Sequence, residues 1–318
     1  MDAVIITKMV DAMHLQQDDV VLINEWCEEK SADLQRFADA IKRKGCKCHT
    51  IVFSEEYQLE LVEKYAQGLD DAWFEPYSDV TVVIDMMERP IGLPPQSLQQ
   101  ERYPIFGRIL QDLFGFMGSH EKMIQITMPP ADDIAMAERI TKALDVDYEQ
   151  LDKACREKVA ELGDKQIFTI TTGENCKLHM ETTGREWNVD AGEGAFPCGE
   201  IYIAPLEEET NGSIFFPTFI IEGIGSFDDV ILKIEDGCVV DSNCEPLNQF
   251  LNQQDEGARV VGELGIGMNP AVEFSGTGAD LDEDALGTFH IGLGMNFMFG
   301  GKNNCRFHMD FVTTGVIQ

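Results

Sequence analysis

Two histidines and an aspartate near the C-terminal end of the chain have the residue types and the spacing of a metal site. His308 and Asp310 stand two residues apart in the segment HMDF, and His290 precedes them in the segment GTFHIGLG. In an extended strand, residues two apart project from the same face, so His308 and Asp310 would point together while the alternate residues pack behind them. An imidazole and a carboxylate on one strand face form half of a divalent-cation site, so the sequence predicts such a site here.

Four glycines surround these residues, and two isolated glutamates precede them. The glycines, which would let the backbone approach the site closely or turn, are Gly292, Gly294, Gly300 and Gly301. Glu200 stands at an expected tight turn in PCGEIYIAP, and Glu263 stands among apolar residues and glycines in VGELGIG. A buried carboxylate in either place needs a partner, which a metal ion would supply. Taken singly, Glu200 could instead cap its turn, and Glu263 could face solvent from an edge strand.

The charge of the chain is strongly negative. It has 57 acidic and 24 basic residues among 318, a formal net charge of -33. Such a surface repels phosphate backbones and anionic lipids, so we expect neither a nucleic-acid nor a membrane partner. It suits neutral or cationic ligands and concentrates divalent metal ions. Two acidic runs, residues 207–209 and 280–284, are expected to be solvated loops, and the second could overhang the metal site and attract a substrate's amino group.

The sequence also predicts a cellular location. No apolar run approaches the roughly 20 residues that span a bilayer, and the N-terminal segment lacks the features of a secretory signal. The nine cysteines are scattered without the paired C-x-x-C spacing of a zinc ribbon, so reduced and mostly buried thiols are expected. We therefore expect a cytoplasmic protein.

The elements that would position the candidate residues differ between the two halves of the chain. Strand-like runs at 20–23, 48–53, 80–84 and 123–127 alternate with helical patterns at 31–44, 55–67, 98–116 and 132–162, the last of which could break near Asp145. This alternation predicts a parallel sheet covered by helices. From residue 166 onward, short alternating runs separated by Gly, Asn and Asp predict a largely antiparallel sheet or partial barrel, with one helix at 247–253.

The expected fold class is therefore α/β plus β. Residues 1–164 would form the α/β domain, and residues 165–318 would form a β-rich, metal-binding catalytic domain. Neither a G-x-G-x-x-G nor a P-loop motif follows the strands predicted in the first half, so a nucleotide site lacks its usual signature.

Four segments occur in an order that resembles the M29 metallopeptidases, the aminopeptidase T and leucyl aminopeptidase group. They are FPCGEIYIAP, VGELGIGMN, GTFHIGLG and HMDF, and the resemblance covers residues 196–312 well and the first half loosely. It implies a homodimer and two neighbouring divalent ions, zinc, cobalt or manganese. The implied ligands are Glu200, Glu263, His290, His308 and Asp310. Such ions lower the pKa of a shared water and polarise the scissile carbonyl, and Glu200 or Glu263 would accept the water's proton. Which glutamate bridges the ions stays open.

One position departs from the family pattern. The resemblance implies a tyrosine where this chain has Phe297, so the ring is kept but the hydroxyl that would steady a tetrahedral oxyanion is missing. Loss of one such donor costs on the order of 3–4 kcal/mol in the transition state. Asn296 or a backbone N–H of the nearby glycines would have to replace it, so Phe297 and Asn296 are candidates for substrate binding.

Three functions are open at this level. The first is a metal-dependent, aminopeptidase-like hydrolase that uses a metal-activated water on a small amide or peptide N-terminus, with Glu200 and Glu263 catalytic. The alternative is a mononuclear non-haem Fe(II) ring-cleaving dioxygenase of the 2,5-dihydroxypyridine type, in which His290, His308 and Asp310 would form the iron triad. The second alternative is a non-catalytic metal-binding homologue. Because a single iron does not need five protein ligands and two cations do, we favour the hydrolase.

Overall fold

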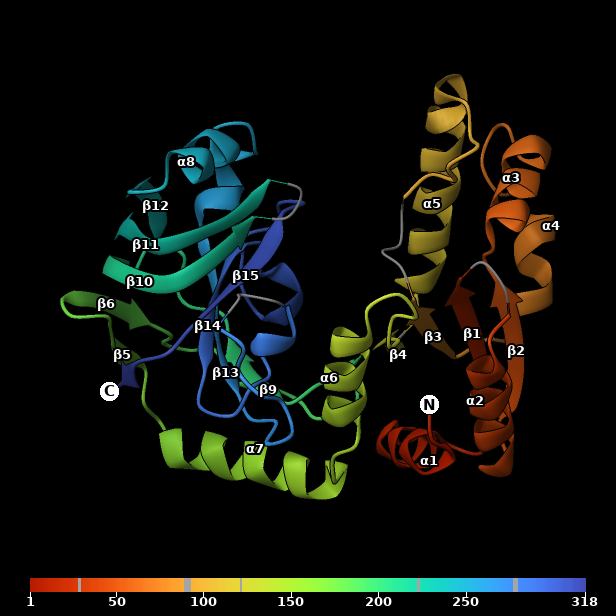
Figure 1. Cartoon of the computed structure of the whole chain (residues 1–318), viewed down its shortest axis with the longest axis horizontal. Coiled ribbons are helices and arrows are strands. Elements are labelled where there is room, and N and C mark those ends of the chain that lie inside the picture. The colour runs from red at the N-terminus through yellow and green to blue at the C-terminus, as the bar shows by residue number, and fades with distance from the viewer. Residues whose placement is uncertain (28–29, 89–92, 121, 222–223, 277–279) are drawn as a thin grey trace. The chain divides into compact units, whose positions relative to one another are not determined.

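The computed structural model of the chain describes residues 1–27, 30–88, 93–120, 122–221, 224–276 and 280–318. The chain divides into two compact units (Figure 1). The first unit comprises Met1–Tyr148 and Gly192–Pro197, and the second comprises Glu149–Ala191 and Cys198–Gln318. The domain limit expected near residue 164 stays a prediction. Helix α7 (Tyr148–Leu162) belongs almost wholly to the second compact unit.

The first unit is built on a five-stranded sheet of order β2-β1-β3-β4-β8, whose described strand pairs are all parallel. The strands are β1 Val20–Trp26, β2 Lys47–Val52, β3 Val82–Met87, β4 Lys122–Thr127 and β8 Ala195–Phe196. Strand β1 is buried along its whole length, as expected for a strand covered by helices on both faces. The predicted α/β class of this half is confirmed.

Helices connect these strands, and several begin at a side-chain cap. They are α1 Ala3–Ala12, α2 Ala32–Arg43, α3 Glu55–Lys64, α4 Asp71–Phe74, α5 Tyr103–Met117 and α6 Ile134–Leu144, with 3-10 turns η1 Glu75–Tyr77 and η2 Gln100–Arg102. Ser31 and Ser54 accept hydrogen bonds from backbone N–H groups in the first turns of α2 and α3. The long helix predicted at 132–162 is two helices, because α6 ends at Asp145.

The second unit contains two antiparallel sheets in place of the single sheet or partial barrel that the sequence predicted. One has the order β12-β11-β10-β6-β5-β16, and the other has the order β15-β14-β13-β9-β7. The strands of the first are β5 Ile167–Thr172, β6 Cys176–Glu181, β10 Thr210–Ile221, β11 Gly225–Glu235, β12 Cys238–Ser242 and β16 Val316–Ile317. Those of the second are β7 Asn188–Asp190, β9 Glu200–Ile203, β13 Val261–Gly267, β14 Phe289–Gly294 and β15 His308–Thr313.

The two sheets of this unit share a core. Phe219 of β10 stacks on Phe311 of β15, with ring centroids 3.8 Å apart. Around the sheets lie α7, α8 Glu245–Leu251 and the 3-10 turns η3 Glu256–Arg259, η4 Asp280–Asp282 and η5 Phe297–Phe299. Because Phe311 faces this core, its strand neighbour Asp310 projects from the opposite face of β15.

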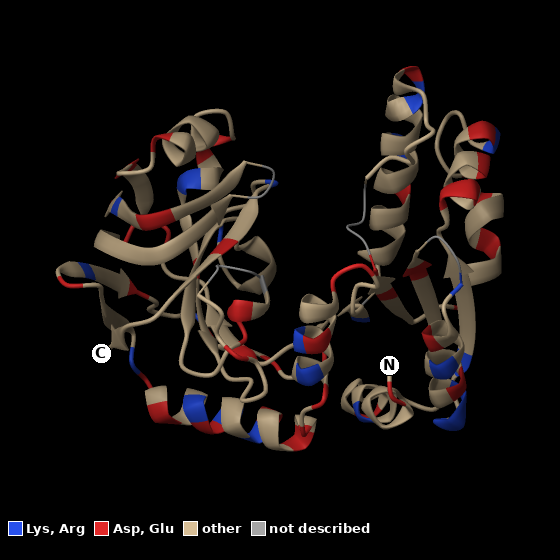
Figure 2. Cartoon of the chain, in the orientation of Figure 1, with Lys and Arg blue, Asp and Glu red and all other residues tan. Residues whose placement is uncertain are grey.

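Charged side chains are distributed over both units (Figure 2). Helix α7 carries both signs, including the pair Arg156–Asp152 at 2.9 Å, which is exposed and adds little to stability. Of the described helices, none is both long and apolar enough to cross a membrane. The nine cysteines are not joined in disulfides, and most of them are buried, as predicted.

Candidate metal centre

The second sheet of the C-terminal unit brings all five predicted ligands to one face. Glu263 on β13 lies opposite Gly292 on β14, and Gly292 lies opposite Asp310 on β15. His290 lies opposite Gly265, two residues along β13 from Glu263. Residues in register project to the same face, as do residues two apart on one strand. The same rule adds His308 from β15, and Glu200 from β9, which lies opposite Gly267.

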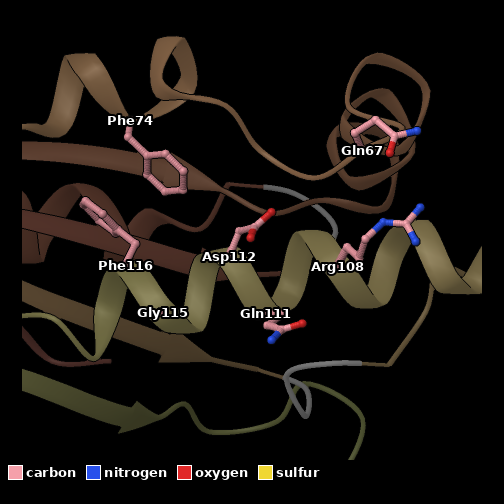
Figure 3. A pocket seen from close by; sticks show the side chains of 7 residues that line it. All are labelled: Gln67, Phe74, Arg108, Gln111, Asp112, Gly115 and Phe116. Atoms are coloured by element: carbon pink, nitrogen blue, oxygen red, sulfur yellow. The ribbon is translucent and has the colours of Figure 1, made fainter.

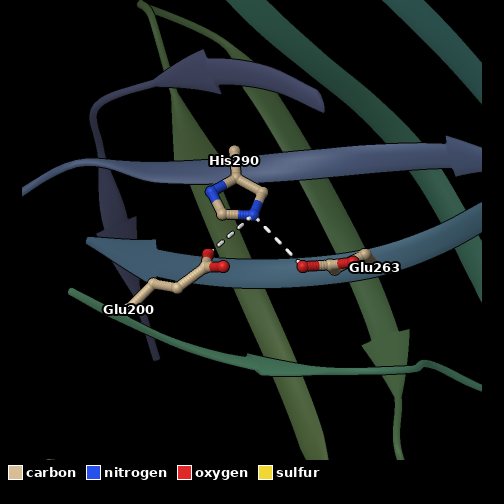
Figure 4. Close-up of side chains that lie close together, drawn as sticks. All are labelled: Glu200, Glu263 and His290. Atoms are coloured by element: carbon tan, nitrogen blue, oxygen red, sulfur yellow. Dashed lines mark hydrogen bonds and ion pairs between the residues drawn. The ribbon is translucent and has the colours of Figure 1, made fainter. Parts of the chain in front are cut away.

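Glu263 lies between the two imidazoles. Its Oε1 is 3.3 Å from His290 Nε2, and its Oε2 is 3.4 Å from His308 Nε2. On the other side of His290, the same Nε2 atom is 3.3 Å from Glu200 Oε2 (Figure 4). Donor atoms within 4.8 Å of one another form two groups, Glu200–Glu263–His290 and Glu263–His308–Asp310. Glu263 is the member that both groups share.

His308 is held in one orientation from behind. Its Nδ1 N–H donates a hydrogen bond to the backbone carbonyl of Met295 at 2.7 Å. In the neutral ring Nε2 therefore carries no proton, and it carries one only when the ring is protonated and charged. Nε2 lies 3.2 Å from Asp310 Oδ2. A carbonyl that fixes the second nitrogen is the usual support of a metal-binding histidine.

Glycines provide the space in which the ligands meet. A Cβ at Gly292 would lie 2.7 Å from Asp310 Oδ1 and 2.7 Å from Glu263 Cβ. Gly294 has φ +107 and lies directly against the backbone carbonyl of Phe307. Gly300, at φ +100, ends η5 in the left-handed conformation. These are the close approaches and turns that the sequence predicted.

The five side chains differ in how deeply they are buried. The exposed fraction is 1% for His290, 7% for Glu263 and 18% for Glu200, whereas it is 23% for Asp310 and 27% for His308. The two ligands on β15 are therefore the most exposed of the five.

The cluster requires positive charge. Burial by itself lowers the pKa of His290, but its hydrogen bond with Glu263 and the charges of Glu200 and Asp310 raise it to about 9. The pKa of His308 rises to about 11, because Asp310 and Glu263 outweigh the effect of burial. Burial raises the pKa of Glu200 well above its usual value, opposed by His290. Glu263 and Asp310 thus favour protons on both imidazoles, with Glu200 adding to the effect at His290, and cations supply the same charge more directly.

Several of these atoms have no hydrogen bond from the protein. Within the described part of the chain, Glu200 Oε2, Asp310 Oδ1 and His290 Nδ1 are buried without a hydrogen bond. Unpaired buried oxygen atoms are costly unless a cation or water satisfies them. Oxygen and imidazole nitrogen donors in this number suit zinc, cobalt or manganese. The residues therefore fit a divalent metal.

Two further acids lie near Glu200: Asp190, which the sequence analysis missed, and Asp284 of the run expected to overhang the site. Asp190 on β7 is in register with Glu200 on β9. Asp284 is buried, and burial together with the charge of Asp190 raises its pKa to about 7. The short alternating runs predicted strands in this half, but only the β7–β9 register places Asp190 next to Glu200. The prediction of a solvated loop at 280–284 is wrong for Asp282 and Asp284, because both are buried; Asp282 accepts hydrogen bonds from Ser275.

The two substrate-binding candidates lie in the loop that carries η5. Phe297 is 60% exposed, whereas Asn296 is buried. The Asn296 amide donates to Glu207 Oε1 at 3.2 Å and accepts from the Asn303 N–H at 2.9 Å, so this side chain holds its own loop. Glu207 is also paired with Arg185 at 2.8 Å, so the prediction of a solvated loop is wrong for Glu207. Glu208 and Glu209 are exposed, as predicted.

The first unit also has a hollow on its surface (Figure 3). It has a volume of about 570 Å³ beside α5 and is lined by Phe74, Phe116, Arg108 and Asp112, among others. Its charged groups are already engaged: Asp112 accepts from the Leu69 N–H at 2.8 Å, and Arg108 donates to the Ala66 carbonyl at 2.9 Å. These contacts hold a loop, so we assign chemistry to the metal centre instead.

Comparisons with known proteins place the chain in a family. The model of the thermophilic metalloproteases (M29) matches residues 131–313, more than half of the chain and all five candidate ligands. The chain belongs to the M29 metalloprotease family. The resemblance inferred from four sequence segments is thereby confirmed. Curated protein sequences yield no match.

Two solved structures share the fold of this M29 chain. Wild-type AmpT from Thermus thermophilus has a TM-score of 0.65 at 18% identity, covering 98% of this chain and 92% of that one. The 2,5-dihydroxypyridine dioxygenase from Pseudomonas putida KT2440 has a TM-score of 0.63 at 14% identity, with the same coverage of 98% and 92%. At these identities the likeness extends to the fold alone, including the α/β half that the sequence segments matched loosely. Membership of the M29 family supports a metal-dependent peptidase.

Proposed function

We propose that this M29 protein is an aminopeptidase-like hydrolase that holds two divalent cations and acts on a small amide or peptide N-terminus. The observation that carries the proposal is the position of Glu263, whose two carboxylate oxygens face two different imidazoles at 3.3 and 3.4 Å. A carboxylate placed in this way suits a bridge between neighbouring cations. Glu200 and His290 would complete one cation site, and His308 and Asp310 would complete the other.

When bound, the cations would polarise the scissile carbonyl and lower the pKa of a water molecule. The chain's own groups provide the proton transfer. Glu200 has one buried oxygen, Oε2, without a hydrogen-bond partner among the described residues, so it is our candidate for the proton acceptor. Glu263, which contacts both imidazoles, would instead remain fixed between the cations.

The substrate would enter from the more exposed side of the cluster, at His308 and Asp310. In the turn η5 there, Phe297 is 60% exposed and Met298 is 83% exposed. Phe299 of the same turn packs edge-on against His308, with ring centroids 5.9 Å apart. We propose that Phe297 and Met298 contact an apolar side chain of the substrate. Asn296 would contribute by holding this turn in place rather than by touching the substrate.

The iron dioxygenase is the second candidate, because His290, His308 and Asp310 alone contain two imidazoles and one carboxylate. His290 Nε2 is 4.0 Å from Asp310 Oδ1, so these groups surround a common point. The fold shared with the dihydroxypyridine dioxygenase is compatible with this reading. Glu200 and Glu263, buried at the same point, favour two cations over one.

The decisive experiment combines metal analysis with two activity assays on purified protein. We expect about two equivalents of zinc, cobalt or manganese and hydrolysis of amino-acid amides such as leucine amide. One ferrous ion with oxygen uptake on 2,5-dihydroxypyridine would replace this proposal with the dioxygenase. Firm metal binding with neither activity would leave the non-catalytic homologue. Light scattering on the same sample tests the homodimer, and fractionation of cells tests the cytoplasmic location; both rest on the family resemblance and the sequence.

A further inference from the structure

Tyr202 lies on the metal face of the sheet. It follows Glu200 by two residues on β9, so both side chains project from the same side. Tyr202 is directly opposite Gly265, and cross-strand partners have Cβ positions about 4.5–5.5 Å apart. The place of a Cβ at Gly265 is taken by His290, whose Nε2 would be only 2.0 Å away. The side chain of Tyr202 therefore leaves β9 next to the position that the imidazole of His290 covers.

Aromatic contacts fix the ring of Tyr202 in this position. Its centroid is 5.4 Å from that of Phe299, at an interplanar angle of 83°. Phe299 in turn contacts His308 edge-on, with centroids 5.9 Å apart. The three rings form one wall of the metal centre, from Glu200 on β9 to His308 on β15. The body of the tyrosine is thus packed against Phe299.

The hydroxyl of Tyr202, by contrast, is not used by the protein. Among the described residues, none forms a hydrogen bond with it, and the side chain is only half-buried. Carboxylates on this face only accept when ionised, and the Nε2 atoms of His290 and His308 face carboxylates. The amide of Asn188, in register with Tyr202, donates to the Tyr202 backbone carbonyl. The hydroxyl of Thr288, which lies against Gly267 on this face, already donates to the Ala285 carbonyl, whereas the Tyr202 hydroxyl is a neutral donor without a hydrogen bond among the described residues.

Amide hydrolysis needs such a donor. When the oxygen of water adds to the carbonyl carbon, the π electron pair moves onto the carbonyl oxygen, and a preorganised N–H or O–H donor stabilises that charge. Phe297 has no donor, and the amide of Asn296 is engaged with Glu207 and Asn303.

We propose that the Tyr202 hydroxyl donates a hydrogen bond to the oxyanion of the tetrahedral intermediate. The proton of the attacking water passes to a carboxylate and then to the leaving nitrogen as the C–N bond breaks, and Tyr202 keeps its own proton throughout. This inference rests on the hydrolase function proposed above.

The test compares three variants of the metal-loaded protein. Tyr202→Phe keeps the ring and removes the donor, whereas Tyr202→Gln removes the ring and keeps an N–H donor. Tyr103→Phe is the matched control, because Tyr103 is 41% exposed on α5 of the other unit. We expect Tyr202→Phe to lower kcat for leucine amide about 10²–10³-fold with little change in KM. Tyr202→Gln should keep more activity than Tyr202→Phe, and Tyr103→Phe should match the wild type.

A binding measurement separates this inference from the proposed function. The phosphonic acid analogue of leucine mimics the tetrahedral oxyanion, and calorimetry should show it binding Tyr202→Phe more weakly than the wild type by a factor similar to the loss in kcat, at unchanged metal content. An active wild type with an equally active Tyr202→Phe variant overturns the role of Tyr202 and leaves the hydrolase intact. Loss of metal from Tyr202→Phe, or lower activity of Tyr202→Gln than of Tyr202→Phe, shows a packing role and also overturns it. A wild type that hydrolyses no amide contradicts the proposed function itself.

Discussion

The imidazole of His290 occupies the space that a side chain at Gly265 would fill. A Cβ built on Gly265 would lie 2.0 Å from both Cε1 and Nε2 of His290, far inside any permitted contact. The ring lies in this gap and so places its Nε2 atom 3.3 Å from both Glu200 and Glu263. A glycine at position 265 of β13 is therefore a structural requirement of the candidate metal centre.

We accordingly predict that Gly265→Ala disrupts the site. The added methyl group must push the His290 ring away from Glu200 and Glu263, and a misplacement of about 1 Å can cost about 10²-fold in rate. Metal content by mass spectrometry and leucine amide hydrolysis would both fall. Gly107→Ala on α5 is the control, since a Cβ there meets nothing within 4 Å; alanine in a helix should stabilise by about 0.5–1 kcal/mol. Wild-type metal affinity in Gly265→Ala would contradict the argument.

Glu263→Gln should separate the two cation sites. An amide lacks the second anionic oxygen that faces His308 at 3.4 Å, so we expect the loss of at least one of two metal equivalents. Hydrolysis should fall sharply with the lost metal, because the cations polarise the carbonyl and activate the water. Glu186→Gln, at an exposed position of the same unit, is the control and should change neither quantity. An unaffected rate would remove Glu263 from the site.

The metal-free protein should lose stability as the pH rises. The pKa of His290 is raised from 6.5 to about 9, since Glu263, Glu200 and Asp310 outweigh the effect of burial. The folded state therefore binds this proton more tightly than the unfolded state, so the contribution is complete below pH 6.5 and is lost as the pH rises through about 9. Asp284 acts in the same direction at lower pH, because burial and Asp190 raise its pKa from 3.8 to about 7.

Thermal unfolding with EDTA at a series of pH values between 6 and 9 checks this expectation. We expect Tm to fall by several degrees over this range, at about 2–4 °C per kcal/mol for a chain of this size class. With saturating zinc or manganese the fall should be smaller or reversed, because metal replaces protons on the same donors and binds more tightly as the pH rises. Equal pH profiles with and without metal would show that the two imidazoles do not bind the metal.

The contacts of Glu207 predict a stability role in a segment where the sequence suggested only a solvated loop. Its carboxylate accepts from Arg185 at 3.0 and 2.8 Å and from the Lys302 N–H at 2.6 Å. Glu207→Gln leaves the largely buried guanidinium without its anion, so we expect a loss of about 1–3 kcal/mol in urea unfolding. The exposed neighbour Glu208 provides the control, as Glu208→Gln should lie within about 0.5 kcal/mol of the wild type. Equal stability of the two variants would show that the ion pair is not a net contributor.

Much of the candidate site could be predicted from the sequence, because it depends on residues that are close together in the chain. His308 and Asp310 are two residues apart and so share a strand face. The glycine-rich segments around Glu263 and His290 predict that the backbone comes close to the site. The β–α alternation of the first half and the short alternating runs of the second are equally local, and they predicted the fold class. The sequence also indicated that the helix predicted at 132–162 could break near Asp145.

Other features depend on contacts between residues far apart in the chain. The bridging position of Glu263, the place of Tyr202 beside His290, and the proximity of Asp190 to Glu200 all follow from the order β15-β14-β13-β9-β7 and its register. A strand pattern fixes which face a residue occupies but not which residue of another strand stands opposite. Hydrogen bonding between strands and packing of their buried faces select one register, and that selection exists only in the folded chain. The sequence by itself thus determined the candidate ligand types and their strands, whereas the tertiary structure decided which of these side chains lie within 4.8 Å of one another.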